Sequence, residues 1–345
     1  MKKTMIVLLV VLLPAAILSA QVTRDFDQYE AGIQQFAEDV ASSLPLNASV
    51  GLGWSDSYIG QFPHFGIGAS LGFSTIPFET ATVVLEPLDL VDTIRNNEAF
   101  QYIEQFGMPL PAYAVEARIG GLLFPFDVGV KVGILPPDFE PGEFLPGLNL
   151  DYTLAGFDVR FPIIEERALI PELSIGGGYN YLRATIGIDG VYGENLILDG
   201  FELPDGTPIL IEMEDPSVEF NWAANVVDLK AQVSKNLLIF RPYAGVGAAI
   251  GFGRAGGGFE SALVSPGQDE IDAINEAAEA LGSEDTIPDI SDLGFSLSAP
   301  MPADWAFRAY GGIGISILIV KLDIMVMYDF IGSNFGGNIG LRVQL

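Results

Sequence analysis

The clearest indication of the fold is the stretch Phe126-Asp127-Val128-Gly129-Val130-Lys131-Val132-Gly133-Ile134, where charges and glycines share one parity and β-branched residues share the other. Side chains of a strand alternate between its two faces, so all the charges of this stretch point one way. The same alternation recurs about eleven times along the chain, including residues 338–345. A soluble sandwich would turn the polar face to water, whereas a membrane barrel turns its apolar face to lipid and its polar face to the lumen.

Composition favours the membrane barrel. Apolar residues make up 49% of the chain, which is high for a soluble secreted protein, while 18% charged residues is too many for a helical membrane bundle. Because only half of each barrel strand faces lipid, a barrel accommodates both values. The formal charge of -29 disfavours binding to nucleic acid, and the absence of cysteine excludes a disulfide framework or a thiolate site.

Residues 1–20 are predicted to be a secretory signal peptide. Lys2 and Lys3 precede an apolar run that ends at Leu18-Ser19-Ala20. The run contains Pro14 and is shorter than the ~20 apolar residues that a spanning helix needs. We therefore expect export and an integral position in the outer membrane.

Residues 46–345 are predicted to form an all-β, antiparallel, up-and-down transmembrane barrel of about 12 strands, with a range of 10–14. The strand candidates are 46–55, 63–74, 111–122, 125–135, 147–161, 171–187, 217–233, 238–254, 304–317, 319–331 and 334–345. Because short turns in such barrels are periplasmic and long loops are extracellular, we expect outward loops at 75–110, 188–216 and 255–303.

The polar parity supplies the residues predicted to line the lumen. They comprise eight acids and eight bases: Glu116, Arg118, Asp127, Lys131, Asp151, Asp158, Arg160, Glu219, Asp228, Lys230, Arg241, Arg308, Lys321, Asp323, Asp329 and Arg342. Many other inward positions are glycine, which leaves room for something to pack inside. Aromatic residues near strand ends, such as Trp54, Trp222 and Trp305, are typical of interfacial girdles.

Residues 21–45 are predicted to contain an amphipathic helix ahead of the barrel. Its apolar residues recur close to a 3.6-residue period, at Phe26, Tyr29, Ile33, Phe36 and Val40, and Pro45 ends the pattern. A helix of about 19 residues would be about 28 Å long, comparable to the hydrocarbon thickness. It is predicted to plug the lumen; the alternative is a periplasmic helix under the barrel mouth.

Two motifs that could suggest chemistry lack the required context. Gly68-Ala69-Ser70-Leu71-Gly72 matches a nucleophile elbow but lies within a strand, and the only histidine, His64, is on that same strand. Residues 251–256 match a dinucleotide fingerprint without a following βαβ unit. We expect no catalytic residues, no enzyme activity and no cofactor.

The longest predicted loop is strongly acidic and contains a candidate helix over Glu270 to Leu281. Its carboxylates, among them Asp269, Glu270 and Asp272, are most simply solvated, with weak Ca²⁺ or Mg²⁺ binding as the alternative. With loop 188–216 they would form an anionic mouth that favours cations.

The signal peptide, the alternating strands, the long outer loops and the final strand 339–345 together resemble an outer-membrane β-barrel family of diderm bacteria. The last residue is Leu345 rather than the usual aromatic, which resembles spirochaete or Bacteroidetes lineages. A helix ahead of a barrel is distantly similar to the layout of long-chain fatty-acid outer-membrane transporters. This resemblance implies outer-membrane lipid and the barrel assembly machinery as partners.

Three function classes follow. The first is a passive channel or transporter for small solutes, favoured by the balanced lumen and the acidic mouth. The second is uptake of a hydrophobic, fatty-acid-type ligand, with the helix near the cargo. The third is a non-conducting structural or adhesive barrel.

Overall fold

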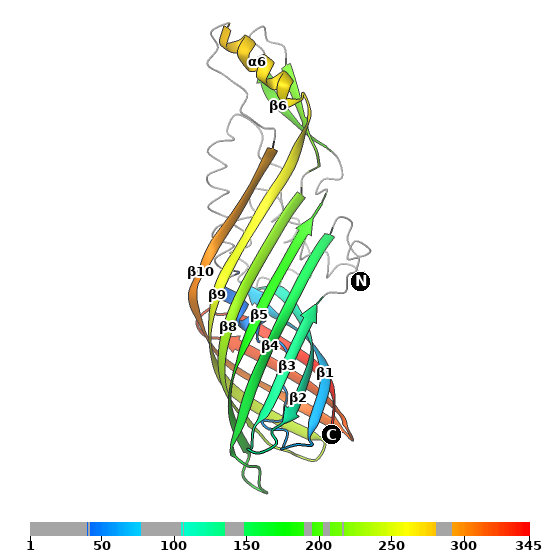
Figure 1. The fold of residues 1–345 in the computed structure, drawn as a ribbon, viewed down its shortest axis with the longest axis vertical. Helices are drawn as coiled ribbons and strands as arrows, with labels where there is room; N and C mark the ends of the chain where they lie inside the picture. Colours follow the sequence, from blue (N-terminus) through cyan, green and yellow to red (C-terminus); the bar gives the residue numbers. More distant parts are fainter. Residues whose placement is uncertain are drawn as a thin grey trace.

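The computed structural model describes residues 40, 42–76, 105, 107–134, 148–189, 195–202, 208–215, 217–280 and 292–345. Ten antiparallel strands form a barrel in the order β10-β11-β12-β1-β2-β3-β4-β5-β8-β9, and pairing of β9 with β10 closes it (Figure 1). The all-β barrel is therefore confirmed, with ten strands where about twelve, in a range of 10–14, were expected.

The barrel strands agree with the alternating stretches of the sequence. They are β1 (Phe65–Ile76), β2 (Met108–Gly120), β3 (Asp127–Ile134), β4 (Leu148–Ile164), β5 (Glu172–Ile188), β8 (Ser217–Ser234), β9 (Phe240–Ser265), β10 (Asp292–Ile317), β11 (Val320–Asp329) and β12 (Phe335–Gln344). The barrel joins its first and last strands, since β1 pairs with β12 from Gly66↔Gln344 to Ser74↔Gly336.

One predicted strand is wrong. Residues 46–55 do not pair with any strand: a short helical stretch ends at Asn47, and the chain then continues without regular structure up to β1. These residues lie inside the barrel, as described below, so their alternation reflects packing against the wall rather than membership of it.

Two of the predicted outer loops contain regular structure. β6 (Leu196–Glu202) and β7 (Pro208–Met213) form a hairpin within 188–216, and Met213 pairs with Leu263 of β9. Both ends of 255–303 are strand, because β9 and β10 stay paired as far as Ala262 and Asp292. The predicted acidic helix is present as α6 (Gln268–Ala280) beyond the end of β9.

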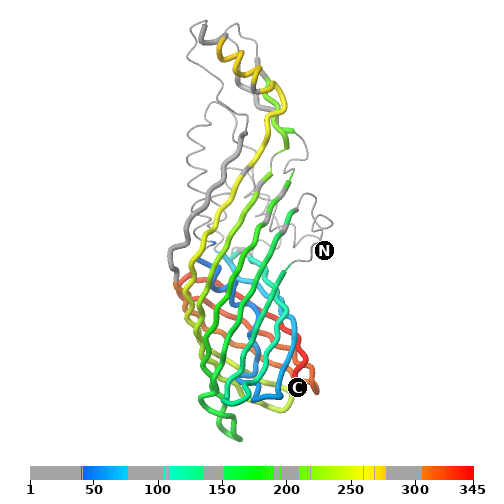
Figure 2. The backbone as a smooth tube through the Cα atoms, in the orientation of Figure 1, coloured from blue at the N-terminus to red at the C-terminus, as the bar shows by residue number. Residues whose placement is uncertain are grey.

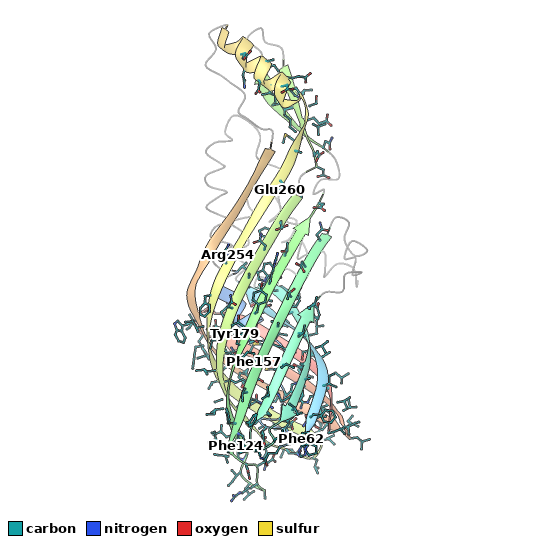
Figure 3. The ribbon with its side chains drawn as sticks, viewed as in Figure 1. Phe62, Phe124, Phe157, Tyr179, Arg254 and Glu260 are labelled. Carbon is teal, nitrogen blue, oxygen red and sulfur yellow. The ribbon has the colours of Figure 1, made fainter. Side chains whose placement is uncertain are left out.

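The wall of the barrel is much taller on one side. β3 has 8 residues, whereas β9 and β10 have 26 each. At about 3.3 Å per residue, 26 residues extend to about 86 Å, far beyond the ~30 Å hydrocarbon layer. Figure 3 shows Arg254 and Glu260 on this extension, while Phe62 and Phe124 lie at the opposite end.

That opposite end, here called the short-turn end, carries the tight connections β2–β3, β4–β5, β8–β9 and β10–β11 and the C-terminus (Figure 1). The main-chain nitrogen of Leu345 donates to the oxygen of Phe65 over 2.9 Å, which fixes the last residue at the rim. The other end is called the long-connection end.

The two faces of the wall differ sharply in polarity. Val130 is 50% exposed on the outside, whereas its neighbour Lys131 is 3% exposed on the inside. The same alternation gives Ile339, Leu341 and Val343 outside and Arg342 inside. The outer surface is thus the apolar one, as a lipid-facing barrel requires. None of the described helices has the length and hydropathy of a membrane-spanning helix.

Candidate functional site

The lumen is occupied by the chain segment that precedes β1, here called the inner segment (residues 40–60, of which all but 41 are described). Near the long-connection end, Asn47 Nδ2 donates to the oxygen of Leu110 over 2.9 Å. Near the short-turn end, the nitrogen of Ile59 donates to Asp127 Oδ2 over 3.1 Å. The segment therefore runs the length of the barrel interior, as the blue part of the tube in Figure 2 shows.

Inward glycines make the space for this segment. A Cβ on Gly66 would lie 2.8 Å from the Trp54 ring, and a Cβ on Gly314 would lie 2.1 Å from Ser55 Oγ. Both distances are shorter than atoms tolerate, so any larger residue would displace the segment. The predicted role of inward glycines as room for packing is seen at these two positions.

Asp56 is the main electrostatic anchor of the inner segment. Its carboxylate pairs with Lys321 Nζ at 2.9 Å, with Arg241 Nη1 at 3.1 Å and with Arg342. Its main-chain oxygen also accepts from Arg160 Nη1 over 2.6 Å. One residue of the segment is thus bound to β4, β9, β11 and β12, on different sides of the barrel.

Trp54 forms a second anchor. Its indole nitrogen donates to Glu116 Oε1 over 2.8 Å, and the guanidinium carbon of Arg342 lies 4.4 Å from its ring centroid. Glu116 also accepts from the nitrogen of Leu52 and from Ser70. Trp54 is 1% exposed, so its predicted place in an interfacial girdle is wrong, and Trp222 is likewise buried.

Lys131 forms a third anchor, through the segment's main chain. Its ammonium donates to the oxygens of Ala48 and Val50, both over 2.6 Å. These contacts use peptide groups that have no strand partner, which explains how an irregular chain can be buried without losing its hydrogen bonds.

Other inward charges pair with each other across neighbouring strands. Arg118 bridges Asp127 at 2.5 Å and Asp158 at 2.7 Å, and Asp158 also pairs with Lys230 at 2.5 Å. Further pairs join Arg160 to Asp127, Arg308 to Asp228, and Arg342 to Asp323. Most of the lumen-lining residues predicted from parity are therefore brought together, as a paired network rather than as an open charged surface.

Two predicted lumen residues face outward instead. Asp151 and Glu219 are exposed, whereas Tyr152 and Trp222, on the opposite parity of the same strands, are buried. Residues of one strand that are separated by an odd number of positions face opposite ways. Asp151 is separated in this way from the inward Asp158, and Glu219 from the inward Asp228. Asp329 is buried but binds the β11–β12 turn, where it accepts from the nitrogen of Gly332 over 3.0 Å.

The lumen is divided along its axis. The charged network occupies the half nearer the short-turn end, whereas the other half is lined by buried apolar side chains. These include Leu110, Ala112, Tyr152, Leu154, Leu182, Ala184, Trp222 and Val226, which pack with Val40, Leu44, Leu46 and Ala48 of the inner segment. An apolar interior facing the long-connection end was not predicted from the sequence.

The predicted plug helix is only partly covered by the described residues. Phe26, Tyr29, Ile33 and Phe36, and the predicted signal peptide, lie outside them. Val40 is 3% exposed and packs in the apolar half of the lumen. Asp56 was not predicted from the sequence. The one feature that distinguishes it is an acidic side chain in a glycine- and serine-rich stretch that directly follows an apolar segment.

The other sequence candidates lie outside the lumen. His64 is exposed at the short-turn end, with Nδ1 2.6 Å from the oxygen of Gln61. Asp269, Glu270 and Asp272 are exposed on α6, and no metal-binding group of three or more His, Cys, Asp or Glu occurs among the described residues.

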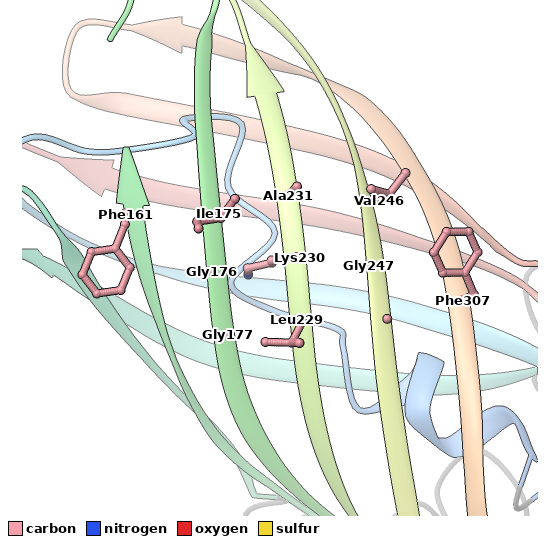
Figure 4. A pocket seen from close by; sticks show the side chains of 11 residues that line it. Phe161, Ile175, Gly176, Gly177, Leu229, Lys230, Ala231, Val246, Gly247 and Phe307 are labelled. Atoms are coloured by element: carbon pink, nitrogen blue, oxygen red, sulfur yellow. The ribbon is translucent and has the colours of Figure 1, made fainter. Parts of the chain in front are cut away.

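The outer surface carries an open groove of about 480 Å³ (Figure 4). Gly177, Ala231 and Ala248 leave the space, and bulkier apolar residues such as Phe161 and Phe307 bound it. Lys230 contributes only its base, since its ammonium binds Asp158 inside the barrel. The groove therefore belongs to the lipid-facing surface and not to the lumen.

No family model matches the chain, and no curated protein matches its sequence. Among solved structures, the outer-membrane protease OmpT of Escherichia coli is similar, with 8% identity and a TM-score of 0.41 over 85% of this chain and 100% of that one. The toluene transporter TbuX of Ralstonia pickettii is similar with 10% identity and a TM-score of 0.27, over 87% of this chain and 92% of that one. The strand order closes the sheet into an antiparallel β-barrel, and the outer surface of this barrel is apolar.

Proposed function

We propose that the protein is a gated transport barrel of the outer membrane, closed by its own inner segment. The observation that carries the proposal is how residues 40–60 are held. They fill the lumen through side-chain contacts to several strands, and no strand pairing fixes them to the wall. Such contacts can break without unfolding the barrel, so displacement of the segment would open a path for small solutes.

A passive, permanently open channel is a poorer fit to this geometry. The inward charges that were expected to face water are paired with each other or with the inner segment. The pairs that involve Asp56 hold a closed state, because moving the inner segment away would leave the largely buried cations Arg241, Lys321 and Arg342 short of a partner.

Planar-bilayer recordings test the gate. The mature chain, residues 21–345, should show mostly closed traces with rare openings, whereas a chain lacking residues 21–58 should conduct steadily. Heat-modifiable migration in detergent would verify that both chains fold. Silence from two folded barrels would contradict transport and favour the structural barrel.

Uptake of a hydrophobic ligand is a second candidate, favoured by the apolar half of the lumen. Leu154, Leu182 and Val226 face inward at the end where the long connections lie. A molecule with an apolar body would be stabilised in this half, because its apolar surface would be removed from water. Mass spectrometry of the purified barrel should then detect a bound apolar molecule, and Leu182→Asn should reduce its amount.

A further inference from the structure

Two arginines are exceptions to the division of charge between the two faces of the barrel. Arg183 on β5 and Arg254 on β9 are exposed on the outer face. In the part of the chain that the structure describes, neither of them forms an ion pair. The other lysines and arginines on the described strands face inward: Arg118, Lys131, Arg160, Lys230, Arg241, Arg308, Lys321 and Arg342.

The register of the sheet brings these two exceptions close together. Ala223 of β8 lies opposite Arg183 on one side and opposite Arg254 on the other. Because neighbouring strands are about 4.8 Å apart, the Cα atoms of the two arginines are separated by about 10 Å, across one small residue. Two unpaired cations at this spacing repel each other, and an anion bound between them would remove the repulsion.

The arginines lie where the outer face of the wall changes from apolar to polar. Toward the short-turn end, the outward residues include the aromatic rings of Tyr179 and Phe157, which Figure 3 shows below Arg254. Toward the long-connection end, the outward residues of β8 are Asn221 and Glu219. A change from aromatic to polar side chains is typical of the interface between a membrane and water.

The distance along β5 agrees with this position. Leu173 is the first outward residue of the strand, and Arg183 follows ten residues later on the same face. Ten residues correspond to about 33 Å of strand, or about 25 Å along the barrel axis at a tilt of about 40°. The apolar band of outer-membrane barrels is also about 25 Å tall. Arg183 would therefore lie at the level of the lipid headgroups, in the leaflet nearer the long-connection end.

We propose that Arg183 and Arg254 together bind the phosphate group of an anionic lipid in this leaflet. The planar guanidinium group matches the oxygen atoms of a phosphate, and two arginines can share one phosphate group. The chain as a whole has a formal charge of -29, so the two exposed cations distinguish this place from the rest of the described outer wall. The inference rests on the proposed membrane position of the barrel, but it is independent of the gate.

Native mass spectrometry of the refolded mature protein in detergent tests the site, with phosphatidylglycerol as the probe. The parent should retain one phosphatidylglycerol molecule in preference to phosphatidylcholine. Arg183→Gln/Arg254→Gln should weaken this binding by at least about tenfold, the change that the loss of one charge-assisted hydrogen bond gives. Arg167→Gln is the matched control and should bind like the parent, because Arg167 is exposed at the short-turn end.

Equal binding by the parent and the double variant would overturn the site, as would an equal loss in Arg167→Gln. Inorganic phosphate is the second probe, and a parent that binds it without binding phosphatidylglycerol would contradict the assignment to a lipid. If the double variant does not fold, the two single variants are measured, and unchanged binding in both would have the same meaning.

Insertion into phosphatidylcholine vesicles, followed by heat-modifiable migration, separates this inference from the membrane position on which it rests. A parent that does not insert would contradict the membrane position and the lipid site with it. A parent that inserts and shows no preference for phosphatidylglycerol would overturn the lipid site alone.

Discussion

The ring of Trp54, on the inner segment, lies against the guanidinium of Arg342 on the last strand, with the guanidinium carbon 4.4 Å from the ring centroid. Arg118 approaches the same ring at 5.5 Å, and Glu116 accepts its indole hydrogen. An aromatic ring close to two cations, with its N–H on a carboxylate, joins the segment to both β2 and β12. This contact links the inner segment to the two strands that flank β1.

Trp54→Ala should loosen the inner segment. The substitution removes a fully buried ring, which costs about 3–5 kcal/mol in protein interiors. We expect protease to cleave residues 40–60 in the folded variant, at a concentration that spares the parent. Trp305→Ala is the control, because Trp305 is 57% exposed on the outer surface. Equal protection of both variants would argue that Trp54 does not hold the segment.

Gly314→Ala should push the segment away from β10. The new methyl carbon would lie 2.1 Å from Ser55 Oγ, a distance that requires Ser55 to move. Gly311→Ala on the same strand is the matched control, since the nearest atom to its Cβ would be 3.6 Å away. More frequent channel openings are expected for the first variant only. Indistinguishable traces would show that Ser55 is not packed against the wall.

Asp56→Ala should destabilise the closed barrel. It removes the carboxylate that pairs with Arg241, Lys321 and Arg342 and leaves these cations short of a partner. Loss of one member of a buried pair costs about 3–5 kcal/mol, so the urea midpoint should fall clearly. Glu166→Gln, which breaks the partly exposed pair with Lys235, should change stability by about 1 kcal/mol or less. A similar urea midpoint for both variants would contradict the assignment of Asp56 as the main electrostatic anchor of the inner segment.

Val130→Asp tests which face meets lipid. Val130 is 50% exposed on the apolar outer surface, and a charge there must be desolvated during membrane insertion. We expect folding into lipid vesicles to fail, whereas Val130→Leu should insert like the parent. A gel shift between heated and unheated samples distinguishes the outcomes. Normal insertion of Val130→Asp would reverse the assignment of the faces.

Much of the barrel could be predicted from sequence because a strand's period of two separates lipid-facing from inward residues. The alternation at Asp127, Val130 and Lys131 identified the two faces of β3 correctly. The same alternation misplaced residues 46–55, since a chain packed against a barrel wall also presents apolar and small residues in turn. Pairing partners distinguish the two cases, and the sequence does not contain them.

The site was less predictable, for physical reasons. The inward charges could be recognised one strand at a time, but Arg118 meets Asp158 and Lys131 meets Ala48 only through the closed barrel. Asp56 had no periodic pattern to mark it, although it contacts more cations than any inward acid that was predicted. The height difference between β3 and β9 was likewise hidden, because the glycine-rich continuation of β9 resembles a loop.

The most direct test of the account fixes the inner segment to the wall. The nitrogen of Ser57 donates to Ser234 Oγ over 3.2 Å, and the chain has no cysteine of its own. Ser57→Cys/Ser234→Cys therefore allows the two sites to be joined by oxidation or by a short thiol cross-linker, with each single variant as control. The measurement is the single-channel current of this double variant before and after reduction. We predict that the folded barrel forms the cross-link, stays silent while it is intact, and shows openings once it is cleaved. Failure of the thiols to join in the folded barrel, or an identical current in both states, would contradict an inner segment that closes the lumen.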